Sequence, residues 1–238
     1  MKYEYLLFNL IVFIFPFLRS FENRVHYVRQ WKYAFPAIVI VLVPFVAWDA
    51  AVAHRHWWFN PAFTVDVHLF GLPIGEWLFF ITVPFACLFI WEILVTLVRP
   101  RQHLKLNFFR FGLVLLAPLG VWLFFSGKEY TGLVMISLTT GVIVDILFQT
   151  GIFLDRRFYI FLVILIGVIF IFNGYLTARP VVLYDPIFQL DFRVMTIPIE
   201  DFFYGISHLF LVIIVYEALK RRAAQIRILE NSYESNSC

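Results

Sequence analysis

The chain has 238 residues, of which 62% are hydrophobic and 15% are charged, and its formal net charge at pH 7 is +3. Ordinary soluble domains are only about 45–50% apolar, so this composition excludes them and indicates an integral membrane protein. The small net charge gives no reason to expect a nucleic-acid partner. Two cysteines, Cys87 and Cys238, indicate neither a disulfide framework nor a cysteine metal site.

Seven apolar segments are long enough to cross a bilayer as helices, which takes about 17–25 residues each. They lie at residues 3–20, 33–53, 74–98, 108–126, 129–150, 158–177 and 198–219. Basic residues gather in the loops after the first, third, fifth and seventh segments. By the positive-inside rule, this pattern predicts an outside N-terminus, a cytoplasmic C-terminus and a multi-pass protein of the cell membrane. The lipid bilayer is therefore an expected partner.

The chain also aligns with itself, without gaps, at a spacing of 125 residues. The aligned pairs include Tyr5 with Tyr130, Asp66 with Asp191, Pro73 with Pro198, and Glu76 with Asp201. Aligned acids and prolines in so apolar a chain indicate an internal duplication. We expect an all-α membrane protein with a 3+1+3 plan, in which two parallel repeats are related by a pseudo-two-fold axis along the membrane normal. The expected units are repeat one (1–107), a linking helix (108–126), repeat two (127–225) and a polar cytoplasmic tail (226–238).

The candidate catalytic residues are Glu76, Glu200 and Asp201, which stand where two of the apolar segments begin. One explanation is purely structural: acids in a first helical turn stabilise the helix, each by about 0.3–1 kcal/mol. Carboxylates at the mouth of a membrane span are costly, however, and their usual explanation is a function. We therefore expect them to transfer a proton or to face a cation in a cavity of low dielectric.

A second set of residues is expected to line or support that cavity. Tyr204 and His208 share a helix face with the acids at 200 and 201. The outer loop of each repeat has an Asn-Pro or Asp-Pro turn and then an aspartate, which favours loops that fold over the site. For His208 and these loops, a purely structural role is the alternative. The full supporting set is Trp48, Asp49, Asn60, Asp66, Trp77, Phe79, Asn173, Asp185, Asp191, Phe202, Tyr204 and His208.

Several motifs are absent from the sequence. It has no G-x-G-x-x-G, no P-loop and no nucleophile elbow, so no cofactor or nucleotide is expected. An isolated His-x-His at residues 54–56 is weak support for a metal, and we expect none. The last span has no lysine before Lys220, which argues against a retinal Schiff base.

The motif Pro-x-(Glu/Gly)-(Glu/Asp)-aromatic occurs twice, from Pro73 and from Pro198, at the heads of membrane helices. In a tandem of three-helix units it resembles the membrane-embedded lycopene cyclases of the heterodimeric or fused type. The resemblance covers essentially the whole chain and departs at Gly75, where the fuller motif has a second acid.

The resemblance implies a reaction as well as a fold. A carboxylic acid protonates the end of an acyclic carotenoid such as lycopene, the cation closes to an ionone ring, and a proton is then lost, with β-carotene as the expected product. Glu76, Glu200 and Asp201 would supply the acid and the base, and aromatic faces would stabilise the cation. The product is an isomer of the substrate, so the enzyme would be an intramolecular lyase or isomerase. Association with other carotenoid enzymes is a further expectation.

Two other classes of protein stay open on the sequence. One is a 3+1+3 small-molecule transporter of the SWEET-like type, which shares the parallel-repeat plan. A sugar path should, however, expose more Asn, Ser, Thr and Gly in mid-membrane than this chain has. The other is a non-catalytic assembly protein. The ring type, the number of ends cyclised and the choice between Glu200 and Asp201 as the acid are also left open.

Overall fold

The computed structural model describes residues 2–236, and within them the chain is mostly helical. Eight α-helices form in this range: α1 (Glu4–Arg19), α2 (Trp31–Val52), α3 (Ile74–Leu97), α4 (Leu106–Val114), α5 (Leu116–Phe125), α6 (Glu129–Leu147), α7 (Arg156–Ala178) and α8 (Ile199–Asn236). The short strands are β1 (Trp57–Phe59), β2 (His68–Leu69), β3 (Leu72–Pro73), β4 (Val182–Tyr184), β5 (Arg193–Val194) and β6 (Ile197–Pro198). Three 3₁₀ turns complete the described structure: η1 (Tyr27–Gln30), η2 (Ile152–Leu154) and η3 (Pro186–Phe188).

Several of these helices have the length and composition of membrane spans, as the sequence predicts. Six segments of residues 2–236 qualify: Tyr27–Val52, Ile74–Leu97, Leu106–Phe125, Glu129–Leu147, Arg156–Ala178 and Ile199–Ser232. The predicted first span folds as α1, whose 16 residues make a helix only about 24 Å long. The structure therefore supports six such segments, and a count of seven stays a prediction.

Two predicted segments differ in detail from the helices that form. The segment predicted at 108–126 divides into α4 and α5 at Leu115. Pro118 has no N–H to donate to the carbonyl of Val114, four residues earlier, which is the last residue of α4. The span predicted at 198–219 forms the first part of α8, which continues to Asn236 and takes in residues 226–236 of the predicted tail. Its polar part is rich in Ala, Arg, Lys, Leu and Glu, which are strong helix formers.

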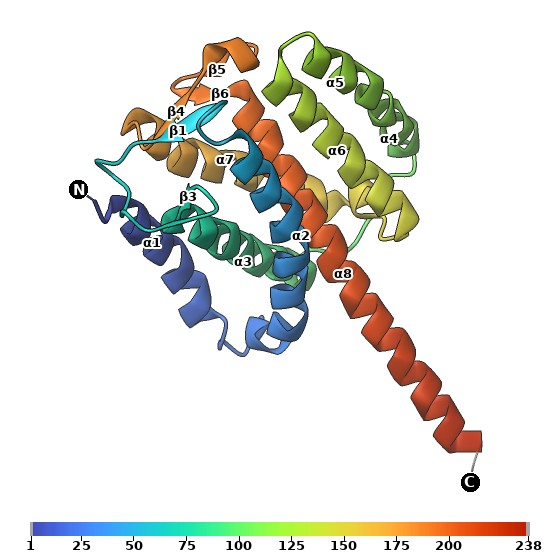
Figure 1. Cartoon of the computed structure of the whole chain (residues 1–238). Coiled ribbons are helices and arrows are strands. Elements are labelled where there is room, and N and C mark those ends of the chain that lie inside the picture. Colours follow the sequence, from blue (N-terminus) through green and yellow to red (C-terminus); the bar gives the residue numbers. More distant parts are fainter. Residues whose placement is uncertain (1, 237–238) are drawn as a thin grey trace.

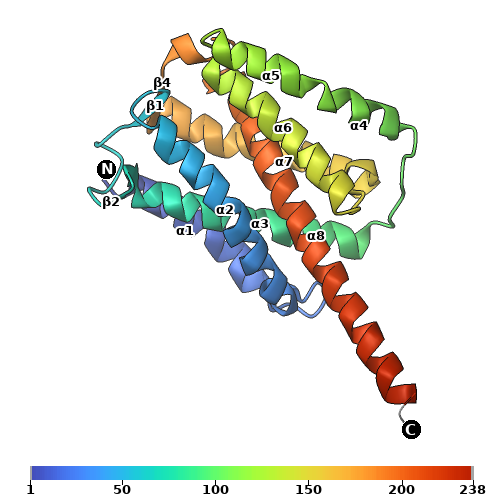
Figure 2. The ribbon, with the colours of Figure 1, turned by 45° about the vertical axis from the view of Figure 1, so that its right-hand side comes forward.

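The long helix α8 crosses the middle of the bundle and its end projects well beyond it (Figure 1). Helices α4 and α5 lie along the outer side of α6 in both views (Figures 1 and 2). Large apolar side chains such as Phe108, Leu115 and Phe125 are exposed there. Exposed apolar surface of this extent is what a lipid-facing helix presents.

The two repeats meet in a way that has two-fold symmetry. Strands β1 and β4 pair antiparallel with Trp58 opposite Leu183, which is its own counterpart 125 residues later. The hairpin β2–β3 corresponds in the same way to β5–β6, strand for strand. A strand that pairs with its own counterpart has the symmetry axis running through the ladder.

A second pair of reciprocal contacts marks the axis at the other end of the bundle. Trp91 Nε1 donates to Glu217 Oε1 at 2.9 Å, and Tyr216 OH donates to Glu92 Oε1 at 2.7 Å. Position 216 is the counterpart of 91, and 217 is the counterpart of 92. Lys220 Nζ contacts both carboxylates, at 2.6 and 3.1 Å. These contacts hold α3 and α8 together around the axis.

Candidate active site

The repeated Pro-Ile motif places one acid of each repeat close to the axis. Pro73 ends β3 in an extended conformation and Pro198 ends β6, so α3 and α8 begin at the next residue. A proline with its fixed φ suits this junction of strand and helix. Glu76 and Asp201 consequently lie in the first turns of α3 and α8, and both are buried.

A third carboxyl joins these two from α2. Asp49, Glu76 and Asp201 line a cavity of about 70 Å³, and we call these three residues the acid cluster. Their exposed fractions are only 3%, 8% and 4%. The carboxyls of Asp49 and Glu76 are neighbours that interact directly. The cavity is also lined by Tyr5, Trp57, Phe59, Phe79, Tyr130, Asn173, Leu176, Val182, Tyr184 and Tyr204.

Tyrosine hydroxyls hold each carboxyl of the acid cluster. Tyr5 OH donates to Glu76 Oε2 at 2.5 Å, and its repeat counterpart Tyr130 donates to Asp201 Oδ1 at 2.7 Å. Tyr204 OH donates to Asp49 Oδ1 at 2.9 Å. Each acid is thereby fixed by a group from another helix, which orients it for chemistry.

Asp201 has two further donors that the other acids lack. Tyr184 OH lies 2.7 Å and Asn173 Nδ2 lies 3.1 Å from Asp201 Oδ2. Burial raises the pKa of Tyr184, on β4, well above its usual value, so its hydroxyl keeps its proton and remains a donor. Asp201 is therefore the most firmly positioned carboxyl of the acid cluster.

An apolar slot of about 340 Å³ opens onto the acid cluster between α1, α3, α7 and α8. Four residues line both the slot and the acid cavity: Phe79, Asn173, Asp201 and Tyr204. Away from them the walls are almost entirely hydrocarbon and aromatic, with His208 as a further polar lining residue. Glu76 and Asp49 do not line the slot. A hydrocarbon lying in this slot thus meets the acid cluster at Asp201.

The lining of slot and cavity contains no Lys or Arg among the described residues. A positive charge that forms on a bound hydrocarbon would lie among the lining residues Asp201, Tyr204, Phe79 and Phe172. Aromatic faces attract cations through their quadrupole, and desolvation strengthens the attraction. The site is therefore suited to proton transfer to a hydrocarbon and to stabilising a carbocation.

A comparison with known families agrees with this chemistry. A sequence profile described as lycopene cyclase matches the chain twice, over residues 2–94 and 127–219, which together make up more than half of it. The chain belongs to the lycopene cyclase family. The two matches begin 125 residues apart, so this cyclase is a tandem fusion of two family units. Searches among curated proteins and among solved structures return no match. Nothing in these comparisons supports the transporter alternative.

The structure places Glu200 of this cyclase beside the cavity and not in its lining. Its Oε1 accepts hydrogen bonds from Thr131 Oγ1 at 2.6 Å and from the backbone N–H of Leu190 at 2.8 Å. Neither partner lines the acid cavity. Glu200 thus ties the outer loop and α6 to the start of α8.

The departure from the family motif at Gly75 has a steric explanation. A Cβ at Gly75 would come within 2.6 Å of Tyr5 Cδ1. The Tyr5 ring occupies the space that a side chain at position 75 would need, and its hydroxyl then reaches Glu76. In repeat two, Glu200 stands at the equivalent position.

The supporting residues divide into a group at the site and a group away from it. Asp49, Asn173, Phe79 and Tyr204 line the acid cavity, and His208 lines the slot. The Trp48 ring packs 4.9 Å from that of Tyr204. His208 Nε2 is a buried atom with no hydrogen-bond partner among residues 2–236.

The remaining predicted residues lie outside the slot and the cavity. Asp66 and Asp191 are exposed, so the outer-loop aspartates do not reach the acid cluster. Asn60 and Asp185 accept hydrogen bonds from the backbone N–H two residues later, which shapes their turns. The other two are Trp77, bonded to the Leu69 carbonyl, and Phe202, packed on Phe170.

Sequence reasoning included Tyr204 but missed the other three tyrosines that bind the acids, Tyr5, Tyr130 and Tyr184. Tyr5 and Tyr130 carry a usable signal, since they align in the two repeats and lie 71 residues before Glu76 and Asp201. Tyr184 has no such signal, because its counterpart is Phe59. Among residues 2–236 no group of three or more His, Cys, Asp and Glu side chains is placed to hold a metal ion. The absence of a metal or cofactor stays a prediction.

Proposed function

We propose that this cyclase closes ionone rings at the ends of an acyclic carotenoid by proton transfer through Asp201. The observation that carries the proposal is the position of Asp201, which belongs to both the acid cluster and the apolar slot. The end of an acyclic carotenoid such as lycopene is pure hydrocarbon, and the side chains that line the slot are mostly apolar.

The reaction begins when Asp201, in its protonated form, gives its proton to the terminal carbon–carbon double bond. The resulting tertiary cation is attacked by the next double bond in reach, which closes a six-membered ring and moves the positive charge onto the ring. Loss of a proton from a neighbouring carbon back to the Asp201 carboxylate restores a double bond. One carboxyl thus acts first as general acid and then as general base. Atoms and electrons balance, so the enzyme is an isomerase of the intramolecular-lyase type, and we propose a β ring as its product.

The other polar groups of the cavity support this carboxyl. Tyr130, Tyr184 and Asn173 fix its orientation through the hydrogen bonds described above. Glu76 and Asp49 lie behind it, away from the slot, and we assign them the supply of protons from the outer side. The walls of the slot exclude water, which would otherwise capture the cation as an alcohol.

Expression in a bacterium that accumulates lycopene tests the proposal. We expect the extracted pigments to contain a cyclic isomer whose retention and spectrum identify the ring. The variant Asp201→Asn should leave lycopene unchanged, and Asp191→Asn, an exposed aspartate of the same repeat, should behave as the wild type. Unchanged lycopene with folded wild-type protein in the membrane would overturn the proposal.

The arrangement in the membrane is a proposal of the same kind. We propose that α1 crosses the bilayer as a seventh span in the cell membrane, with the N-terminus outside and the end of α8 in the cytoplasm. The support is the excess of Lys and Arg in alternate loops. Labelling of single cysteines from each side, placed at Tyr3, near Arg24 and near Arg222, tests it. The cysteine at Tyr3 should react from the outer side only, and the other two from the cytoplasmic side only.

A further inference from the structure

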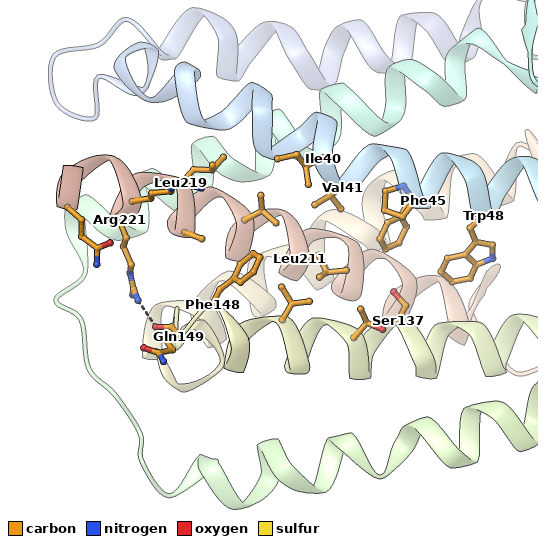
Figure 3. Close-up of a pocket in the computed structure, with 17 residues that line it drawn as sticks. Ile40, Val41, Phe45, Trp48, Ser137, Phe148, Gln149, Leu211, Leu219 and Arg221 are labelled. Carbon is orange, nitrogen blue, oxygen red and sulfur yellow. Dashed lines mark hydrogen bonds between the residues drawn. The ribbon is translucent and has the colours of Figure 1, made fainter. Parts of the chain in front are cut away.

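A second and larger groove runs between α2, α6 and α8 (Figure 3). It has a volume of about 960 Å³, and Ile40, Val41, Phe45 and Leu211 form part of its apolar wall. Trp48 stands near one end, and Arg221 bonds the carbonyl of Gln149 at the other (Figure 3). The function proposed above makes no use of this groove.

The groove is the symmetry counterpart of the apolar slot. A shift of 125 residues carries much of the lining of one onto the lining of the other. The equivalent lining pairs are Ile40 and Leu165, Pro44 and Ile169, Trp48 and Asn173, Val12 and Ser137, Ala86 and Leu211, Ile90 and Val215, and Ile93 and Ala218. A substrate with two identical ends therefore meets two related apolar channels.

The two channels differ where they approach the acid cluster. In the slot this position is Asn173, a small residue whose amide donates a hydrogen bond to Asp201. A ligand in the slot can therefore reach the Asp201 carboxyl. In the groove, Trp48 stands at that position and packs against the Tyr204 ring. Glu76, the counterpart of Asp201, does not line the groove.

A glycine provides the second difference. Gly205 lines the slot, and its counterpart is Phe80, a fully buried ring packed against His208. A Cβ at Gly205 would lie only 3.3 Å from Ile169 Cδ1. The space that the slot keeps open beside α8 is filled by an aromatic ring in the other half. Two positions that line the slot, Asn173 and Gly205, are thus replaced by large aromatic side chains, Trp48 and Phe80, in the other half.

We propose that only the slot is a reaction channel, that Trp48 closes its counterpart, and that the two ends of a carotenoid are cyclised in turn at one centre. This inference rests on the proposed function. An extended polyene cannot turn round inside the slot, so the molecule must leave after its first ring and return with its other end. The monocyclic carotenoid is consequently released as a free intermediate.

Matched variants test which channel reacts. Ala86 lines the slot and Ala218 lines the groove, and both are partly buried. Ala86→Trp should lower the rate of both ring closures by about a hundredfold, because the chain end no longer reaches Asp201. Ala218→Trp should leave both rates unchanged. Accumulation of monocyclic product in Ala218→Trp would overturn the inference. Each variant is first checked for its level in the membrane and for a single elution peak in detergent.

A measurement on the wild type needs no variant. Protein in liposomes is given labelled lycopene together with an excess of unlabelled monocyclic carotenoid. If the monocyclic carotenoid is released between the two ring closures, the label in the bicyclic product should be strongly diluted. The amount of labelled monocyclic carotenoid should also rise before that of the bicyclic product. Undiluted label in the bicyclic product from the earliest time would overturn the inference. A wild type that forms no ring at all would instead contradict the proposed function, so the two failures are distinguishable.

Discussion

The two repeats hold their acids in the same way and differ in what those acids can reach. Glu76 and Asp201 each begin a helix after an extended proline, and each accepts a hydrogen bond from a tyrosine 71 residues earlier. Only Asp201 also has Tyr184 and Asn173 as donors and lines the apolar slot. Glu76 faces Asp49 instead. The duplication thus accounts for the shared geometry of the two acids. A few side chains that differ between the repeats leave only Asp201 in contact with the slot.

The largest expected effect sets the two acids against each other. Asp201→Asn should lower ring formation by about 10²–10⁴-fold, the range typical of a lost general acid or base. Glu76→Gln should lower it much less, because Glu76 does not line the slot. The measurement is the initial rate of cyclic product at equal amounts of protein in the membrane. Equal losses in both variants would show that the two halves share the chemistry.

A second prediction removes the difference at position 75. Gly75→Glu gives repeat one the full two-acid motif, but its side chain collides with the Tyr5 ring. We expect a destabilisation of about 1–3 kcal/mol from overpacking, together with loss of the bond from Tyr5 to Glu76. A thermal-unfolding assay in detergent measures it. Gly205→Ala, at a slot glycine of α8, is the control for a smaller steric change, and an unaltered melting temperature for Gly75→Glu would refute the steric explanation.

The paired tyrosines allow a matched test of positioning. Tyr130→Phe removes one hydroxyl donor to Asp201 and should slow ring formation, because that hydrogen bond stabilises the carboxylate that forms as Asp201 gives up its proton. A hydrogen bond to a charged group contributes about 1.5–3 kcal/mol. Tyr5→Phe makes the same change beside Glu76 and should slow the reaction less. Rates at several substrate concentrations separate the effects, because a positioning role lowers kcat and leaves KM nearly unchanged. A larger loss in Tyr5→Phe than in Tyr130→Phe would reverse the assignment of the two halves.

The smallest effect is expected at Glu200. Glu200→Gln retains an oxygen that accepts from Thr131 and Leu190, so activity should stay within a few-fold of wild type and stability should fall by about 1 kcal/mol. Glu200→Leu removes the acceptor and should destabilise the protein by about 1–3 kcal/mol through the unpaired N–H of Leu190. A loss of activity in Glu200→Gln as large as that in Asp201→Asn would show that Glu200 is the acid instead.

Much of the frame could be predicted from the sequence because it depends on local patterns. Apolar length predicts the membrane helices, proline predicts where α3 and α8 begin, and the spacing of 125 residues predicts the repeat. The same reasoning placed Asp49 and Asn173 at the depth of the acids, and the structure has both in the cavity. These properties need no knowledge of how helices are rotated against one another.

The rest depends on helix rotation, which a sequence pattern fixes only coarsely. Successive residues of a helix point about 100° apart, so Glu200 and Asp201 point in different directions, and only Asp201 lines the cavity. The sequence does not reveal which of them turns inward, and packing against Tyr130 and Thr131 decides it. The hydrogen bond from Tyr184 likewise exists only because β4 pairs with β1 across the repeats. That pairing joins segments more than a hundred residues apart.

The ladder of β1 and β4 has a consequence for the ancestry of the chain. Because each strand faces its own counterpart, a single ancestral unit could have paired with an identical copy of itself through this same edge. In such a homodimer any substitution appears on both sides at once. Joining the copies through α4 and α5 gave every ancestral position two independent residues, so a tryptophan at 48 no longer required one at 173. In a fused chain the two halves can change separately, provided that the pairing of β1 with β4 is kept.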